Sequence, residues 1–154
     1  MAEVSSTEVR RLREETGAGV MDCKRALVAA EGDFGRAKEL LRQQGLAAAE
    51  KKAERATSQG LVECYIHGGG RIGALVEVNC ETDFVARTAE FRELARELAM
   101  QIAAMNPGSV DELLEQPYIR NAAQAVKDLV AERIARTGEN IRVRRLARFQ
   151  LGED

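Results

Sequence analysis

The sequence of 154 residues is poor in the residue types on which most active sites and metal sites depend. It has a single histidine, His67, and three widely spaced cysteines without a CxxC pair, Cys23, Cys64 and Cys80. In a cytosolic chain such cysteines are expected to be buried thiols. HExxH, GxSxG and the glycine-rich nucleotide-binding fingerprints are absent. The sequence therefore predicts no catalytic residues, no metal ligands and no cofactor.

Long apolar runs and a large net charge are missing as well. No stretch approaches the roughly 20 apolar residues that a membrane-spanning helix needs, and the first five residues show no secretory pattern. The formal charge is −2, so no global field attracts nucleic acid. The arginines between 142 and 148 lack interleaved aromatics, which favours a solvated strand face. We expect a cytosolic protein with no membrane contact and no direct nucleic-acid contact.

The amino-terminal third of the chain predicts helices. A Ser-x-x-Glu capping pattern opens the first helix, and a glycine stands where each of three short helices should end, at Gly17, Gly32 and Gly45. The next segment has high helix propensity but few large apolar groups, which is typical of a solvated connecting helix. We therefore expect a three-helix domain over 1–45 and a linker helix over 46–59.

Beyond residue 60 the apolar spacing changes from nearly four residues to two. The alternating runs 61–67 and 71–80 are joined by three glycines, which predicts a β-hairpin. Amphipathic helices and a last alternating strand follow, over residues 91–105, 109–116, 119–137 and 141–151. Helices placed between a hairpin and a returning strand predict an antiparallel sheet covered on one face. The fold class is α+β, with a core domain over 60–154.

One stretch lies between the hairpin and the next amphipathic stripe, at residues 79–86. It contains Phe84, one of four phenylalanines, at a strand-to-helix junction. There Phe84 can project beside Asp83 as an anchor for a partner protein. The residues alone allow equally well that Phe84 folds back into the core.

Three blocks of the sequence resemble the elongation factor Ts family. They are LREETGAGVMDCKRAL at 12–27, VNCETDFVA at 78–86 and GENIRVRR at 138–145. Their order is that of the family, and they span the amino-terminal helices, the hairpin and the last strand. The resemblance implies a guanine-nucleotide exchange factor of the GTPase elongation factor Tu, which acts by binding and is not an enzyme.

The resemblance also implies two contact regions. In that family the amino-terminal bundle resembles ubiquitin-associated domains and grips a helix of the GTPase. Carried over, the contact residues are Arg13, Val20 and Met21, with Val20 where family members often have Met. The second region is the TDFV element, which consists of Thr82, Asp83, Phe84 and Val85. It is implied to insert Phe84 between helices of the GTPase and to disturb the site of Mg²⁺ and the nucleotide phosphates.

Two other interpretations remain open. The chain is also compatible with a ubiquitin-associated-like interaction module without exchange activity, although such a module does not need the TDFV element. An RNA-binding protein that uses the arginines of 142–148 is a third interpretation, and it requires strongly salt-dependent affinity.

The predicted sheet also favours a homodimer. A hairpin and one returning strand leave one face and an edge without a partner. The alternation places four apolar residues on this second face, Leu61, Tyr65, Leu75 and Leu146. Long members of the family carry a second, related core half, and a two-fold pair of short chains would supply its equivalent.

Overall fold

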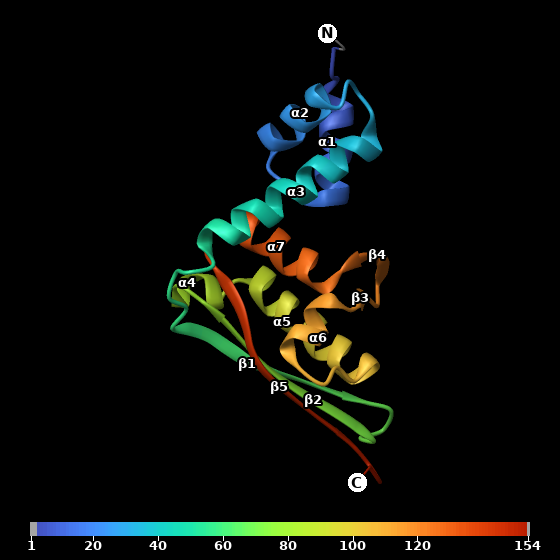
Figure 1. Cartoon of the computed structure of the whole chain (residues 1–154), viewed down its shortest axis with the longest axis vertical. Coiled ribbons are helices and arrows are strands. Elements are labelled where there is room, and N and C mark those ends of the chain that lie inside the picture. The colour runs from blue at the N-terminus through green and yellow to red at the C-terminus, as the bar shows by residue number, and fades with distance from the viewer. Residues whose placement is uncertain (1–2, 154) are drawn as a thin grey trace.

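Three helices pack into a bundle at the amino end of the computed structural model, which describes residues 3–153 (Figure 1). They are α1 (Ser6–Thr16), α2 (Val20–Ala29) and α3 (Phe34–Lys52). The predicted capping box is confirmed: the Ser5 hydroxyl accepts from the Glu8 backbone N–H, and the Glu8 carboxylate accepts from the Ser5 N–H. This satisfies donors that a helix start leaves open and fixes where α1 begins.

The third helix is longer than the sequence suggested. α3 runs without a break through 19 residues, so the predicted stop at Gly45 is wrong. A glycine inside a helix costs only about 1 kcal/mol, which strong helix formers on either side offset. The third bundle helix and the first part of the expected linker helix are thus one element. The linker helix predicted over 46–59 ends at Lys52, so it is wrong for residues 53–59. The domain division at 1–45, 46–59 and 60–154 stays a prediction.

The rest of the described chain contains a three-stranded antiparallel sheet. Its strands are β1 (Gln59–His67), β2 (Ile72–Cys80) and β5 (Ile141–Gln150), in the order β1-β2-β5. The turn between β1 and β2 consists of three glycines at 68–70, all with positive φ. Only glycine adopts this conformation without strain, so the predicted hairpin is confirmed at its turn.

Helices cover one face of this sheet, and a small second sheet lies beside them (Figure 1). These elements are α4 (Asp83–Ala86), α5 (Ala89–Met105), α6 (Val110–Glu115), β3 (Pro117–Tyr118), β4 (Asn121–Ala125) and α7 (Val126–Thr137). The expected α+β class is therefore confirmed.

The segment before α7 departs from its prediction. Residues 119–125 were expected to begin a helix, but they belong to the hairpin of β3 and β4. Gln101, which is fully buried on α5, accepts from the Ile119 backbone N–H at 2.9 Å and donates to the Pro117 carbonyl at 3.0 Å. A buried amide must find partners, and it finds them in this extended backbone. The tertiary contact overrides the local helix preference.

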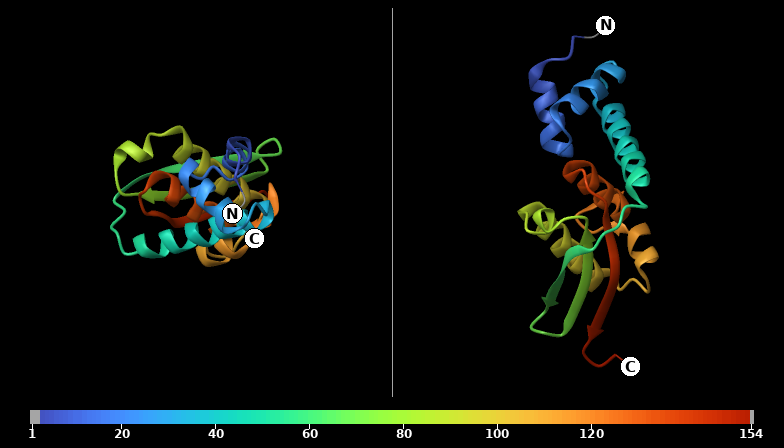
Figure 2. Two further views of the ribbon diagram at one scale, coloured as in Figure 1. Left: turned by 90° about the horizontal axis from the view of Figure 1, so that it is seen from above. Right: turned by 90° about the vertical axis from the view of Figure 1, so that its left-hand side faces the viewer.

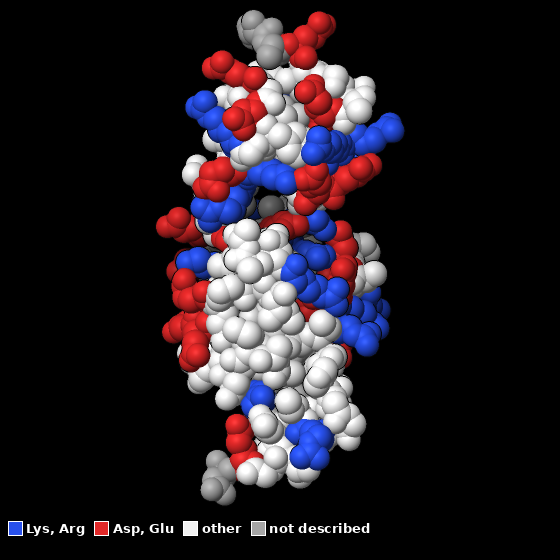
Figure 3. Space-filling view, turned by 90° about the vertical axis from the view of Figure 1, so that its right-hand side faces the viewer, with Lys and Arg blue, Asp and Glu red and all other residues white. Residues whose placement is uncertain are grey.

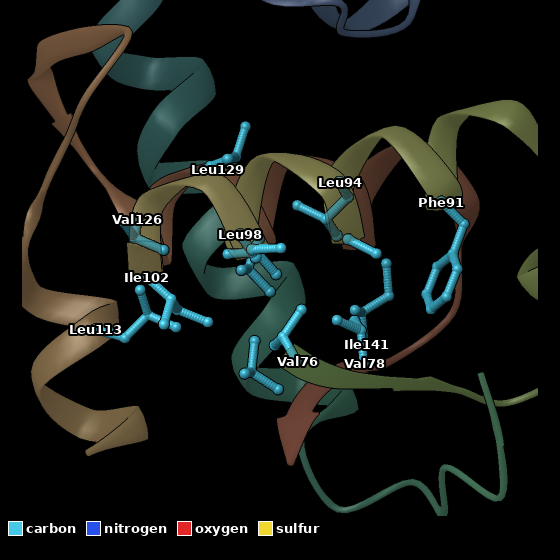
Figure 4. Close-up of a cluster of buried hydrophobic side chains, with 14 of the residues drawn as sticks. Val76, Val78, Phe91, Leu94, Leu98, Ile102, Leu113, Val126, Leu129 and Ile141 are labelled. Carbon is cyan, nitrogen blue, oxygen red and sulfur yellow. The ribbon is translucent and has the colours of Figure 1, made fainter. Parts of the chain in front are cut away.

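The main hydrophobic core lies between the covered face of the sheet and the helices (Figure 4). Figure 4 labels side chains from β2, α5, α6, α7 and β5 that meet there, namely Val76, Val78, Phe91, Leu94, Leu98, Ile102, Leu113, Val126, Leu129 and Ile141. A smaller cluster fills the bundle, with Leu12 and Leu27 fully buried.

The side chains on each face of the sheet differ from those that the alternation in the sequence predicted. Leu61 and Tyr65 lie opposite Val78 and Ala74, and they pack against the core. The predicted second-face positions are wrong for Leu61, Tyr65 and Leu146, whereas Leu75 is exposed as expected. Both faces of β1 carry apolar side chains, so the period of two did not decide which face is covered.

A β-bulge explains the position of Leu146. Glu77 lies opposite Arg145 and Val78 lies opposite Val143, so Arg144 is the extra residue of β5. One extra residue moves the following side chains to the opposite face. Leu146 therefore points to the core, and Phe149 points to the uncovered face, which we call the outer face.

Charged residues join the bundle to the core. The Arg42 guanidinium lies 3.3 Å from the buried Asp128 carboxylate, and Arg136 donates to the Thr16 carbonyl at 3.3 Å. α3 also packs along α7. Figure 3 shows that basic and acidic side chains gather at the waist between the two parts of the molecule.

Candidate functional site

The TDFV element begins at the end of β2 and forms the single turn of α4. Thr82 is its N-cap, because the Thr82 hydroxyl accepts from the Val85 backbone N–H at 3.3 Å. Val85 is buried in the core cluster, and the buried Cys80 thiol donates to the Thr82 carbonyl at 3.1 Å. A helix of four residues is not stable by itself, so these contacts hold it in place.

Phe84 projects from this turn into solvent. Its exposed fraction is 79%, which decides between the two alternatives that the sequence left open. Asp83 beside it is also exposed and pairs with Arg87 at 3.0 Å. In the right-hand view of Figure 2, α4 protrudes from the core below the bundle. Burying a Phe side chain stabilises a protein by about 1.5–3 kcal/mol, so an exposed Phe on an anchored turn is a candidate contact for a partner.

The four predicted residues of the TDFV element therefore differ in accessibility. Thr82, Asp83 and Phe84 are exposed, and Val85 is buried. The Val85 side chain anchors the turn to the hydrophobic core. The surface open to a partner consists of the other three residues.

The three predicted contact residues of the bundle are all exposed. Arg13 lies in the last turn of α1, and Val20 and Met21 lie in the first turn of α2. A short loop joins the two helices, and Gly17 caps α1 with a φ of 67°. Because the loop is short, the end of α1 and the start of α2 share one end of the bundle. Exposed Val and Met side chains beside an arginine suit a protein interface.

Sequence reasoning missed a residue that touches the TDFV element. The Glu139 carboxylate accepts from the backbone N–H groups of Glu81 and Thr82, at 3.1 and 3.0 Å. It also accepts from the Thr82 hydroxyl at 2.7 Å. Glu139 was noted only as part of the block at 138–145. Its distance from Thr82 along the chain left no local signal of this contact.

Two further groups with possible reactivity are His67 and Cys80. His67 is exposed, and its ring is hydrogen-bonded to the Tyr65 hydroxyl at 2.9 Å. Burial, followed by the charge of Glu139, raises the pKa of the Cys80 thiol to about 11, so this thiol stays protonated at neutral pH.

Within residues 3–153, no three His, Cys, Asp or Glu side chains are arranged to hold a metal ion. No helix in that range is long and apolar enough to cross a membrane.

Comparison with known proteins identifies the family. Residues 81–154 match the family model described as elongation factor TS. The elongation factor Ts of Carboxydothermus hydrogenoformans is 48% identical over 97% of this chain and 90% of its own length. That of Caldanaerobacter subterraneus is 47% identical over 97% of this chain and 98% of its own length. The chain belongs to the elongation factor Ts family.

The elongation factor Ts of Rippkaea orientalis is a further relative, 47% identical over 99% of this chain and 80% of its own length. The alignments with the first two relatives span 195 residues, more than the 154 of this chain. These relatives therefore contain residues that have no counterpart here. The role of the chain is that of an elongation factor Ts in translation, a family whose general function is nucleotide exchange on elongation factor Tu.

Proposed function

We propose that this chain binds elongation factor Tu in its GDP form and promotes release of GDP and its replacement by GTP. The observation that carries the proposal is Phe84, exposed on a capped and anchored turn in a member of the elongation factor Ts family. Such a factor acts by binding alone, without a reaction or a cofactor of its own. The role would place the chain in the cytosol, where translation takes place.

The proposed mechanism is a wedge. Phe84 enters between helices of the GTPase, and Thr82 and Asp83 contact the same surface. Displacing those helices disturbs the site of Mg²⁺, whose charge holds the nucleotide phosphates. GDP then leaves faster. By linkage, a factor that weakens nucleotide binding is itself weakened by nucleotide to the same degree, so GTP releases the factor again.

The bundle supplies a second contact in this proposal. Arg13, Val20 and Met21 are exposed together and are separate from α4. A bundle that holds one helix of the GTPase raises the effective concentration of Phe84 at its own site. The two contacts therefore have different expected roles: the bundle contributes affinity, and Phe84 contributes the loss of nucleotide.

The decisive experiment follows the release of fluorescent GDP from elongation factor Tu. We expect faster release with the wild-type chain and near-intrinsic release with Phe84→Ala. Met105→Ala, which removes another exposed apolar side chain, is the matched control and should behave like wild type. Release at the intrinsic rate with saturating wild-type chain would contradict the proposal. Binding without release would favour the interaction module.

We also propose that two copies of the chain associate through the outer face. Val62, Ile66, Leu75 and Phe149 are exposed there, from all three strands of the sheet. Contiguous apolar surface of this kind marks association sites, and closed two-fold pairs are the commonest homo-oligomers.

Sedimentation equilibrium tests the dimer directly. We expect the wild-type chain to approach twice the monomer mass as its concentration rises. Phe149→Glu should remain a monomer, because two charges would be buried without partners. Glu153→Ala, a change near the same strand end outside the apolar surface, is the control. A wild-type chain that stays monomeric at every concentration would rule the dimer out.

A further inference from the structure

Glu139 lies in the turn between α7 and β5, far from the TDFV element in the sequence and in direct contact with it in space. Its carboxylate is half-buried and accepts three hydrogen bonds from the backbone and side chain where α4 begins. Hydrogen bonds to a charged acceptor are roughly twice as strong as neutral ones. The carboxylate therefore holds the backbone of Glu81 and Thr82 against the start of β5.

The contact with the Thr82 hydroxyl has a specific consequence for the cap of α4. A hydroxyl has one proton to donate, and Thr82 donates it to Glu139 at 2.7 Å. Its lone pairs are then free to face the Val85 backbone N–H, which donates to this oxygen at 3.3 Å. The Glu139 carboxylate thus orients the hydroxyl in the sense that capping requires.

The neighbouring residues make the connection reciprocal. The Asn140 backbone N–H donates to the Glu81 carboxylate at 3.2 Å, so each of the two segments donates to a carboxylate of the other. The buried Asn140 side chain donates to the carbonyls of Ala53 and Arg55, which come after α3. The base of the TDFV element, the start of β5 and the segment after α3 therefore meet at one point.

We propose that Glu139 is a positioning residue for Phe84: it fixes Thr82, and through this cap it fixes the direction in which the turn of α4 projects Phe84. The inference rests on the function proposed above, because Phe84 is the group that must be aimed. Glu139 itself does not need to touch the GTPase. Because Glu139 already orders α4 in the free chain, binding to the GTPase loses less conformational entropy.

Two substitutions at Glu139 separate its interactions. Glu139→Ala removes all three hydrogen bonds, and we expect the maximal rate of GDP release to fall about 10-fold. Glu139→Gln keeps an oxygen for the two backbone N–H groups but loses the acceptor for the hydroxyl proton. The decrease in the rate of GDP release should therefore be smaller than with Glu139→Ala. Glu112→Ala is the matched control, because the Glu112 carboxylate also accepts from a backbone N–H, that of Gly108 at 2.9 Å.

Substitutions at Thr82 test the path through the hydroxyl. GDP release from elongation factor Tu should be slower with Thr82→Val, which removes the hydroxyl, than with Thr82→Ser, which keeps it. Combining Thr82→Val with Glu139→Gln should give no further loss, because both changes remove the same oriented hydroxyl. Losses that add independently would contradict a shared path.

Two readouts on the isolated protein do not depend on exchange. The chain contains no tryptophan, so Phe84→Trp introduces a single fluorescent reporter at an exposed position. We expect the anisotropy of this indole to fall when Glu139→Ala is added, while the melting temperature changes little. Amide hydrogen exchange at Glu81 and Thr82 should become faster in Glu139→Ala and stay unchanged in Glu112→Ala.

These readouts distinguish the failure of this inference from the failure of the proposed function. Unchanged anisotropy and amide protection in Glu139→Ala would overturn the positioning role, whatever happens to GDP release. Reduced GDP release without a change in either readout would assign Glu139 to direct contact with the partner instead. If the wild-type chain does not accelerate the release of GDP from elongation factor Tu, the proposed function fails. The two readouts still decide whether Glu139 orders α4.

Discussion

α4 and α5 are consecutive helices in the chain and present a phenylalanine in opposite ways. Phe91 on α5 is 1% exposed and lies in the middle of the core, whereas Phe84 on α4 is 79% exposed. Both helices begin with a threonine N-cap, Thr82 for α4 and Thr88 for α5. The caps are alike, so the difference comes from the length and burial of the helix after each cap.

α5 has 17 residues and an apolar stripe that reaches across the sheet, so its position is decided by burial. α4 has four residues, of which only Val85 and Ala86 are buried. Its position depends instead on hydrogen bonds to Thr82 from both sides. A long helix can thus bury most of its apolar side chains in the core. A short and tethered helix keeps an aromatic side chain available to a partner.

The largest expected effect comes from truncating the buried member of the pair. Phe91→Ala should lower the free energy of unfolding by about 3–5 kcal/mol, because it leaves a cavity that the core fills poorly. Phe84→Ala is the matched control and should change it by less than about 0.5 kcal/mol. Chemical denaturation followed by circular dichroism measures both. Equal losses would mean that Phe84 also packs in the folded protein.

The next largest effect is on exchange. Phe84→Ala should cost about 2–4 kcal/mol of exchange efficiency, which is roughly a 30- to 1,000-fold decrease. The physical reason is the loss of a central aromatic anchor, with the melting temperature nearly unchanged. Stopped-flow release of fluorescent GDP from elongation factor Tu gives the rate. If Phe84→Ala accelerates GDP release as fast as the wild-type chain does, Phe84 has no special role in exchange.

The two caps provide a smaller test. Thr88→Ala should destabilise the chain by about 1 kcal/mol, because it removes the hydroxyl that accepts from the Phe91 backbone N–H at 3.2 Å. Thr82→Ala should affect exchange more than stability, because α4 contributes little to the core. Thermal melting and GDP release, measured on both variants, separate the two effects. A larger loss of stability from Thr82→Ala than from Thr88→Ala would reverse the comparison.

The smallest effect concerns thiol reactivity at neutral pH. Cys23 and Cys80 are buried with a raised pKa, as expected of free thiols. The expectation is wrong for Cys64, which is exposed on the outer face. A thiol reagent should label one cysteine in the folded chain and three after denaturation. If the outer face mediates the proposed dimer, labelling of Cys64 should also slow as the protein concentration rises. Rapid labelling of all three cysteines under native conditions would contradict the buried positions.

The raised pKa of Cys80 also predicts the direction in which stability changes with pH. The folded state favours the neutral thiol, so this contribution to stability is complete below the unfolded pKa of about 9. It is lost as the pH rises toward the folded pKa of about 11. The free energy of unfolding should therefore decline over this alkaline range in wild type, and decline less in Cys80→Ala.

Local signals in the sequence predicted a large part of the fold. The capping box of α1, the glycine at the end of α1 and of α7, and the glycine turn of the hairpin are all present. Each depends on the chemistry of a few neighbouring residues, which is why sequence suffices for them. The seven predicted contact residues of the candidate site rest on family resemblance and stay predictions, although the structure exposes all of them except Val85.

The failed predictions share a physical cause. Gly45 was expected to end α3, yet the neighbouring helix formers and the packing of α3 along α7 together outweigh the cost of one glycine. Residues 119–125 were expected to be helical, yet the buried Gln101 amide needs their backbone as a partner. In both cases a contact with a distant part of the chain outweighed a local preference.

The sequence by itself determined the class of fold, the start of α1 and the hairpin, because caps, turns and apolar periods act over a few residues. It also determined the family, because the blocks at 12–27, 78–86 and 138–145 are legible without coordinates. The tertiary structure alone decided that Phe84 is exposed, which face of the sheet is covered, and that Glu139 meets Thr82. These depend on strand register, on one bulge at Arg144 and on a turn that returns beside the end of β2. A period of two or four residues contains no information about which distant segment will lie opposite it.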